Sequence, residues 1–146
     1  MVSRNDSPSE IDSTWSQVPA SGQKLRDRKA IRRYVEEIDR SSPGQQCVLY
    51  VTVALDLIEA MRWCGESAPA LALETRTILR HGAAIGAAGF ILARTDPDEN
   101  YYPDRLTVLA VSKLRRFSAD FDLPLLDYLV FSVGQTFSVG WGERRE

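Results

Sequence analysis

Histidine and cysteine are scarce in this chain, which holds one histidine, His81, and two cysteines, Cys47 and Cys64. A single histidine cannot complete a three-ligand zinc site, and no nucleophile elbow accompanies it for Ser-His-Asp chemistry. We therefore interpret His81 as a surface or hydrogen-bonded helix residue. The cysteines form no CxxC or other close pair, so we interpret them as buried thiols in a reducing compartment.

Long apolar runs and phosphate-binding loops are also missing. The longest apolar stretch, Ile85 to Ala93, is far too short to span a bilayer, and Met1 to Glu10 lacks the apolar core of a signal peptide. No GxxxxGK loop occurs, and no GxGxxG follows a strand. The net charge of -2 gives no general attraction to nucleic acid. The sequence predicts a soluble, cytoplasmic protein that does not enter a membrane.

The length and composition favour a single domain. A chain of 146 residues with 44% hydrophobic residues can form one substantial core. Residues 1–22 are rich in Ser, Pro, Asp and Gly without periodicity, which predicts a flexible tail, disordered or loosely docked, before a domain over 23–146. Trp15 is the exception in this tail, and it is either a docking anchor or a spare aromatic residue.

A leading helix is expected over 23–40. Apolar residues at helical spacing give it one buried face: Ile31, Tyr34, Val35 and Ile38. Its first half is strongly basic: Lys24, Arg26, Arg28, Lys29, Arg32 and Arg33. These charges form either a solvated surface or a contact for phosphates or an acidic partner. Lys24, Arg28 and Arg32 are the binding candidates.

The rest of the chain alternates between strand and helix patterns. The expected elements are strands over 47–57 and 58–64, a helix over 74–86, a strand over 88–93, a helix over 104–120 and a hairpin over 125–133 and 135–139. The helix over 104–120 should begin with Asp104 as its cap. Its expected buried stripe is Leu106, Leu109, Ala110, Leu114 and Phe117. This order predicts an α/β fold with a central sheet flanked by helices.

Four segments in the second half of the chain carry a resemblance to a known family. They are the small-residue strand at 87–93, Arg94-Thr95-Asp96-Pro97, Pro103-Asp104-Arg105-Leu106-Thr107 and Leu125-Leu126-Asp127-Tyr128. The chain resembles the RadC-type JAB (MPN) domains, which have His-x-His-Pro-Ser-Gly, Pro-Ser-x-x-Asp and Leu-Leu-Asp-His after the strand. No gap is needed between Pro97 and Asp127. The resemblance implies a JAB/MPN-like (cytidine deaminase-like) sandwich with a mixed central sheet flanked by helices.

The departures from that family fall on its chemistry. In its active members two histidines and an aspartate hold zinc, a glutamate activates water, and a serine helps to stabilise the oxyanion. The residues in these places are, in the same order, Arg94, Asp96, Thr107, Gln45 or Gln46, and Asp104. The guanidinium of Arg94 stays protonated and would repel a dication. The resemblance therefore predicts a degenerate member without catalysis, zinc or another cofactor.

The loop at 96–104 holds four carboxylates: Asp96, Asp98, Glu99 and Asp104. Oxygen ligands of this kind suit Mg²⁺ or Ca²⁺, but their spacing matches no EF-hand. A solvated acidic loop, paired with Arg94 and Arg105, is the favoured interpretation.

Three functions stay open. The first is a non-catalytic interaction or scaffold module with a protein partner or a second copy, for which Tyr101 and Tyr102 are candidate contacts. Metal-free members of the wider MPN superfamily commonly serve in this way. The second is a hydrolase with a rebuilt, zinc-free site around Arg94, Asp96 and Asp104. The third is a nucleic-acid-binding protein that uses the basic leading helix, because the family is traditionally labelled DNA repair.

Overall fold

The computed structural model describes residues 15–18, 22–40, 46–63, 75–97, 105–138 and 144–145, which fold around one mixed sheet. The sheet has the strand order β1-β3-β2-β4-β5-β6-β7. Its strands are β1 (Trp15–Val18), β2 (Gln46–Val51), β3 (Leu57–Trp63), β4 (Gly89–Thr95), β5 (Leu125–Ser132), β6 (Gln135–Ser138) and β7 (Arg144–Arg145). Its helices are α2 (Arg28–Asp39), α4 (Thr75–Ala84) and α5 (Arg105–Asp120). β4 and β5 are parallel, with α5 as their crossover, and the other neighbouring strands are antiparallel.

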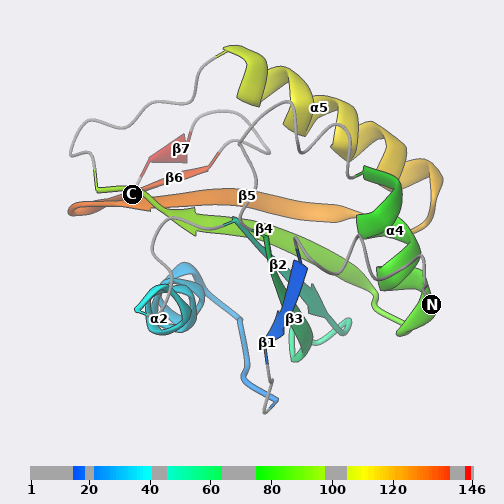
Figure 1. Ribbon diagram of the computed structural model, residues 1–146, viewed down its shortest axis with the longest axis horizontal. Helices are drawn as coiled ribbons and strands as arrows, with labels where there is room; N and C mark the ends of the chain where they lie inside the picture. Colours follow the sequence, from blue (N-terminus) through cyan, green and yellow to red (C-terminus); the bar gives the residue numbers. More distant parts are fainter. Residues whose placement is uncertain are drawn as a thin grey trace, which may run out of the picture.

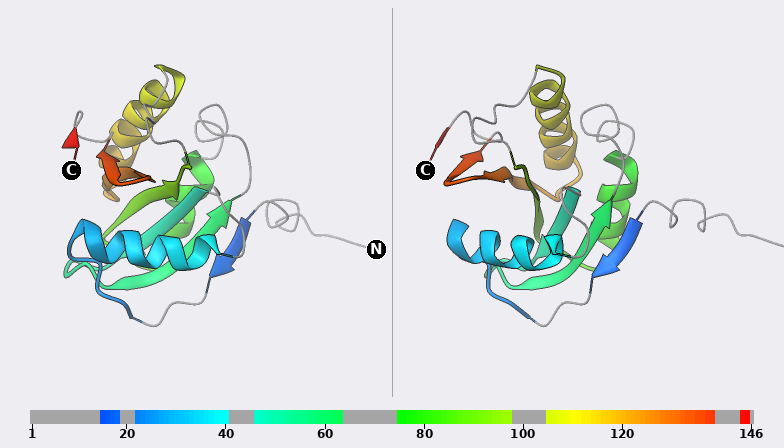
Figure 2. Two further views of the ribbon diagram at one scale, coloured as in Figure 1. Left: turned by 90° about the vertical axis from the view of Figure 1, so that its left-hand side faces the viewer. Right: turned by 60° about the vertical axis from the view of Figure 1, so that its left-hand side comes forward.

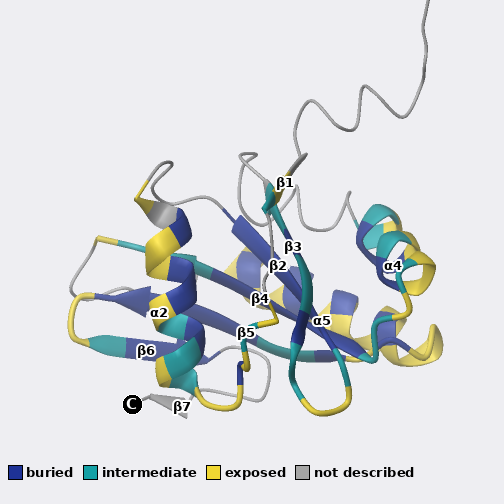
Figure 3. Ribbon diagram, turned by 90° about the horizontal axis from the view of Figure 1, so that it is seen from below, coloured by how far each residue is buried: buried dark blue, intermediate teal, exposed yellow. Residues whose placement is uncertain are grey.

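Helices cover both faces of this sheet, so the predicted α/β sandwich is confirmed. In Figure 1, α4 and α5 lie on one face and α2 lies on the other. Side chains alternate between the faces, so that Val48 and Tyr50 of β2 pack with α4 and α5, whereas Cys47 and Leu49 pack with α2. Every residue of β2 is buried because both of its faces are covered. Figure 3 shows α2 from outside, with exposed residues on its outer side.

The leading helix is shorter than the sequence predicted. α2 begins at Arg28, because Asp27 caps it by accepting a hydrogen bond from a first-turn backbone N–H at 2.8 Å. The residues before the cap are extended, and Leu25 among them is buried, with its N–H donating to the carbonyl of Leu55 at 2.8 Å. The prediction of a helix from residue 23 onward was therefore wrong, and Lys24 lies outside the helix.

An edge strand lies where the sequence predicted part of a flexible tail. β1 pairs antiparallel with β3, in a register that runs from Trp15↔Trp63 to Val18↔Ala60. Val18 is half-buried against the cluster beneath α2. The tail prediction for 1–22 was therefore wrong for the residues of β1. The side chain of Trp15 lies outside the described part of the structure, so its expected role as an anchor or a spare aromatic residue stays a prediction.

Helix α5 turns a different face toward the sheet from the one that the apolar pattern predicted. Its buried residues are Thr107, Ala110, Val111, Leu114 and Ser118. Leu106, Leu109 and Phe117, which the pattern placed inside, are 61%, 58% and 49% exposed. The pattern failed because it counted large apolar residues, whereas the sheet accepts two small hydroxyl residues at the contact. The outer side of α5 is consequently rich in exposed apolar side chains.

Candidate functional site

Two of the three positions expected to hold zinc ligands, those of Arg94 and Asp96, lie together at the end of β4. Arg94 lies on the α5 side of the sheet, since Leu92, two residues earlier, packs in the cluster with α5. The Nη1 atom of Arg94 lies 3.1 Å from Oδ2 of Asp96, and the two side chains are only 17% and 19% exposed. The structure therefore brings the two residues at the positions that the resemblance assigns to histidines into one partly buried ion pair.

Two further side chains extend this pair into the sheet. The Nε of Arg94 donates to the hydroxyl of Tyr128 at 3.4 Å, and that hydroxyl donates to Oε1 of Gln46 at 3.3 Å. Gln46 is buried at 4% exposure, and its Nε2 has no hydrogen-bond partner among the described residues. The neighbouring pair Cys47↔Ala93 explains why the start of β2 lies beside the end of β4. Of the two glutamines expected at the glutamate position, Gln46 lies beside Tyr128, and Gln45 is outside the described residues.

Of the other expected site residues, Thr107 is among the residues that the structure describes. Thr107, at the place of the metal-binding aspartate, is buried at 4% exposure on the sheet-facing side of α5. Asp104, Tyr101 and Tyr102 lie outside the described residues, as do the acidic loop residues Asp98 and Glu99. Within the described ranges, no group of three or more His, Cys, Asp or Glu side chains could hold a metal ion.

Sequence reasoning missed the part played by Tyr128. A signal was available, because Tyr128 follows Leu125-Leu126-Asp127 where the family has histidine after Leu-Leu-Asp. Its ring is fully buried and its hydroxyl joins Arg94 to Gln46, so it is the centre of this polar group. The polar groups gathered here are the guanidinium of Arg94, whose charge is neutralised by Asp96, and the amide donor of Gln46.

The only histidine of the chain lies elsewhere, on α4. Its Nε2 is 2.6 Å from a carboxylate oxygen of Glu59 on β3, and its ring centroid is 5.4 Å from that of Tyr50. The interpretation of His81 as a hydrogen-bonded helix residue is confirmed.

The basic candidates near the chain start are engaged within the protein. Lys24 Nζ lies 2.7 Å from Asp56, and Arg28 Nη2 lies 3.6 Å from Asp127. Arg32 donates to Ser132 O at 2.8 Å. It also pairs with a neighbouring glutamate at 2.8 Å and lies over an aromatic ring of β5. These side chains hold α2 and the segment before it against the sheet, so the structure gives them a packing role.

Comparison with protein families agrees with this fold. The chain matches the family model described as RadC-like JAB domain over residues 25–145, and it belongs to that family. Comparison with curated proteins gives no match. Across the described ranges, none of the helices has the length and apolar character needed to cross a membrane.

Proposed function

We propose that this chain is a RadC-like JAB domain that has no zinc hydrolase activity and works by binding another protein. The observation that supports this most is the Arg94–Asp96 ion pair at the positions that the family resemblance assigns to the two zinc-binding histidines. A fixed positive charge disfavours a dication there, and the paired carboxylate is already neutralised. The fold itself keeps both apolar clusters, so it remains a rigid platform.

Metal analysis tests the loss of zinc chemistry. The purified protein is expected to carry far less than one zinc per chain after dialysis against zinc and then against buffer. A stoichiometric zinc content would contradict the proposal, because a three-ligand site binds tightly and would survive dialysis. Partner binding is tested by a pull-down with the wild type and with Tyr101→Ala/Tyr102→Ala, which is expected to capture less of the partner. A chelator should not reduce capture by the wild type, because the proposed binding needs no metal.

The nucleic-acid alternative has less support, since Lys24, Arg28 and Arg32 are all paired internally. Reversing those residues would disturb the fold and would not test binding. Three basic residues of the same segment are exposed instead: Arg26, Lys29 and Arg33. Their combined replacement by glutamate is expected to leave any DNA retention unchanged, and a steep salt-dependent affinity that this variant abolishes would favour the alternative.

A further inference from the structure

The second half of α5 carries an exposed patch in which apolar and charged side chains share one helical face. We call its five residues, which follow the spacing of such a face, the α5 patch: Lys113, Arg116, Phe117, Asp120 and Phe121. Phe121 follows the last residue of α5 but keeps the helical register, since its N–H donates to the carbonyl of Phe117 at 3.1 Å. All five residues are exposed, and the two phenylalanines are 49% and 48% exposed.

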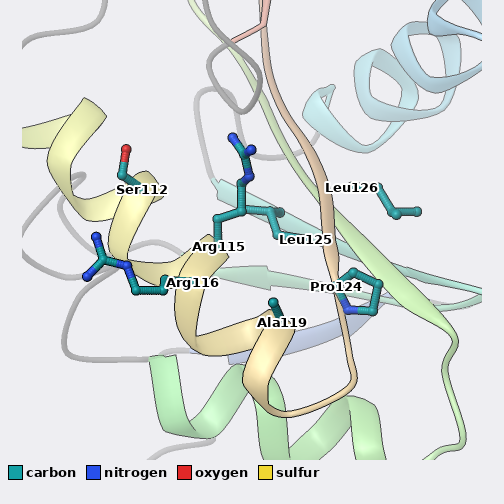
Figure 4. A pocket seen from close by; sticks show the side chains of 7 residues that line it. All are labelled: Ser112, Arg115, Arg116, Ala119, Pro124, Leu125 and Leu126. Atoms are coloured by element: carbon teal, nitrogen blue, oxygen red, sulfur yellow. The ribbon is translucent and has the colours of Figure 1, made fainter.

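The α5 patch is uncovered by the other described elements. Figure 1 and Figure 2 show α5 at the outer surface of the molecule, with the sheet beneath it and no described helix or strand over its outer side. In Figure 4 the side chain of Arg116 points away from Pro124 and Leu126. Neighbouring aromatic rings that stay exposed within a border of charged residues are typical of a protein interface.

The charges of the α5 patch are not used inside the chain. Within the described ranges, Lys113, Arg116 and Asp120 form no ion pair, in contrast to Arg28 and Arg32 of α2. Asp120 is the only acidic residue of α5. The patch therefore offers both a carboxylate and two cations to a partner, beside the two aromatic rings.

This arrangement is complementary to itself. When two copies of α5 lie antiparallel about a two-fold axis at Phe117, each residue faces the one that lies equally far from Phe117 on the other helix. The two Phe117 rings then meet at the axis. Asp120 lies three residues after Phe117, so it faces the turn of the second copy that holds Lys113 and Arg116. Phe121 faces the alkyl chain of Lys113, which is able to cover an aromatic ring.

We propose that the α5 patch joins two copies of this chain in a symmetric dimer. The two signs of charge favour a second copy over an acidic peptide or an anionic bilayer, since either of these would meet Asp120 with like charge. The contact covers about 12 Å of helix, which is short for a stable interface, so the dimer should dissociate at micromolar concentrations. The inference rests on the proposed function, because it names a second copy of the chain as the protein that is bound.

A charge-reversal experiment on the full-length protein tests the dimer. Sedimentation velocity between about 1 μM and 500 μM measures its dissociation constant. Asp120→Lys and the double variant Lys113→Glu/Arg116→Glu each bring like charges together across the axis, and each is expected to weaken dimerisation by about tenfold or more. An equimolar mixture of the two variants restores opposite charges at both contacts. The mixture should therefore form heterodimers at least as tightly as the wild type dimerises.

Two control variants lie at the other end of α5. Arg105→Glu changes an exposed basic residue, and Leu109→Ala changes an apolar residue that is 58% exposed. Both should weaken dimerisation by less than about threefold, whereas Phe117→Ala should weaken it by about tenfold, because the two rings at the axis are lost together.

The inference is overturned if the wild type stays monomeric at the highest concentration, if the controls lose as much affinity as the patch variants, or if the mixture forms no heterodimers. A stoichiometric zinc content would refute the proposed function but leave these dissociation constants unchanged. The two failures are therefore distinguishable.

Discussion

The hydroxyl of Tyr128 on β5 lies 3.3 Å from Oε1 of Gln46 on β2, and both side chains are buried. This bond satisfies the amide oxygen but leaves the Nε2 of Gln46 without a partner in the described part of the chain. A buried polar group that loses its partner costs more than a pair that is removed together. The two residues should therefore be energetically coupled.

Tyr128→Phe is expected to lower the free energy of unfolding by about 1–3 kcal/mol, since it leaves Oε1 of Gln46 unpaired. Gln46→Met keeps the volume and removes both amide atoms, so the double variant should be more stable than Tyr128→Phe alone. Urea unfolding of the four proteins in a double-mutant cycle measures the coupling. Strict additivity would mean that the hydroxyl and the amide do not interact.

Restoring the family's ligands tests whether these positions form the old metal site. The triple variant Arg94→His/Asp96→His/Thr107→Asp is expected to bind about one zinc per chain, because two imidazoles and a carboxylate suffice with water as fourth ligand. Elemental analysis and cobalt substitution spectra measure this. The control is Asp96→His/Thr107→Asp, which keeps the Arg94 guanidinium and should bind none. A folded triple variant without metal would show that the three positions do not converge.

The sequence predicted the elements of the second half well because strong periodic patterns and a family resemblance agreed there. The helices expected over 74–86 and 104–120 are α4 and α5, with ends shifted by at most two residues. The hairpin expected after Leu125 is β5 and β6. Whether a segment forms a helix or a strand is indicated by the period of its apolar residues, and this period can be read from the local sequence.

The errors arose where tertiary contacts decided the outcome. The basic run before Asp27 looked helical, but Leu25 is buried in extended backbone beside the loop that follows β2. Ser118 is buried because its hydroxyl joins α5 to β5, a role that no hydropathy pattern contains. The same limit applies to the site: residue identities predicted the loss of zinc ligands, but the hydrogen bonds of Tyr128 to Arg94 and Gln46 join three strands that only the tertiary fold brings together.

Close packing at Gly82 gives a further prediction. A Cβ placed on Gly82 would lie 2.4 Å from a methyl carbon of Leu123 and 2.8 Å from the ring of Tyr50. That ring cannot retreat easily, because its hydroxyl donates to Ile78 O at 2.8 Å. Gly82→Ala is therefore expected to lower the free energy of unfolding by about 1–3 kcal/mol, despite the better helix propensity of alanine.

Thermal and urea unfolding measure the effect of Gly82→Ala against Ala83→Ser, a change on the exposed side of α4 that should stay within about 0.5 kcal/mol. A stabilised Gly82→Ala protein would mean that α4 can move away from Tyr50 at little cost.

Two buried tyrosines should respond in opposite ways to loss of their hydroxyl groups. Tyr50 donates to Ile78 O at 2.8 Å, whereas the hydroxyl of Tyr34 has no partner in the described ranges. Tyr50→Phe is expected to cost about 1–2 kcal/mol, because Ile78 O loses its side-chain donor. Tyr34→Phe should be neutral or stabilising, since it removes an unpaired buried polar group. Equal losses in the two variants, measured by urea unfolding, would contradict this assignment.

Both tyrosines also predict how stability changes at alkaline pH. Burial, with smaller contributions from Cys47 and Glu37, raises the pKa of Tyr34 from 10.0 to about 12. Burial, with Glu59 as a smaller cause, raises the pKa of Tyr50 as well. A raised folded-state pKa means that the native protein favours the neutral hydroxyl. Stability from this source is therefore complete below pH 10 and is lost as pH rises above it, because the unfolded chain releases these protons first.

Each tyrosine should lower the free energy of unfolding by about 1 kcal/mol between pH 10 and pH 11. Urea unfolding at pH 9, 10 and 11 measures this slope in the wild type and in Tyr34→Phe. The variant should lose the share of the slope that belongs to Tyr34, while other titrating groups affect both proteins equally. The prediction fails if the two slopes agree, since Tyr34 would then titrate alike in the folded and unfolded chains. A steeper slope in the variant would reverse the sign of the argument and would place a tyrosinate-stabilising charge beside Tyr34.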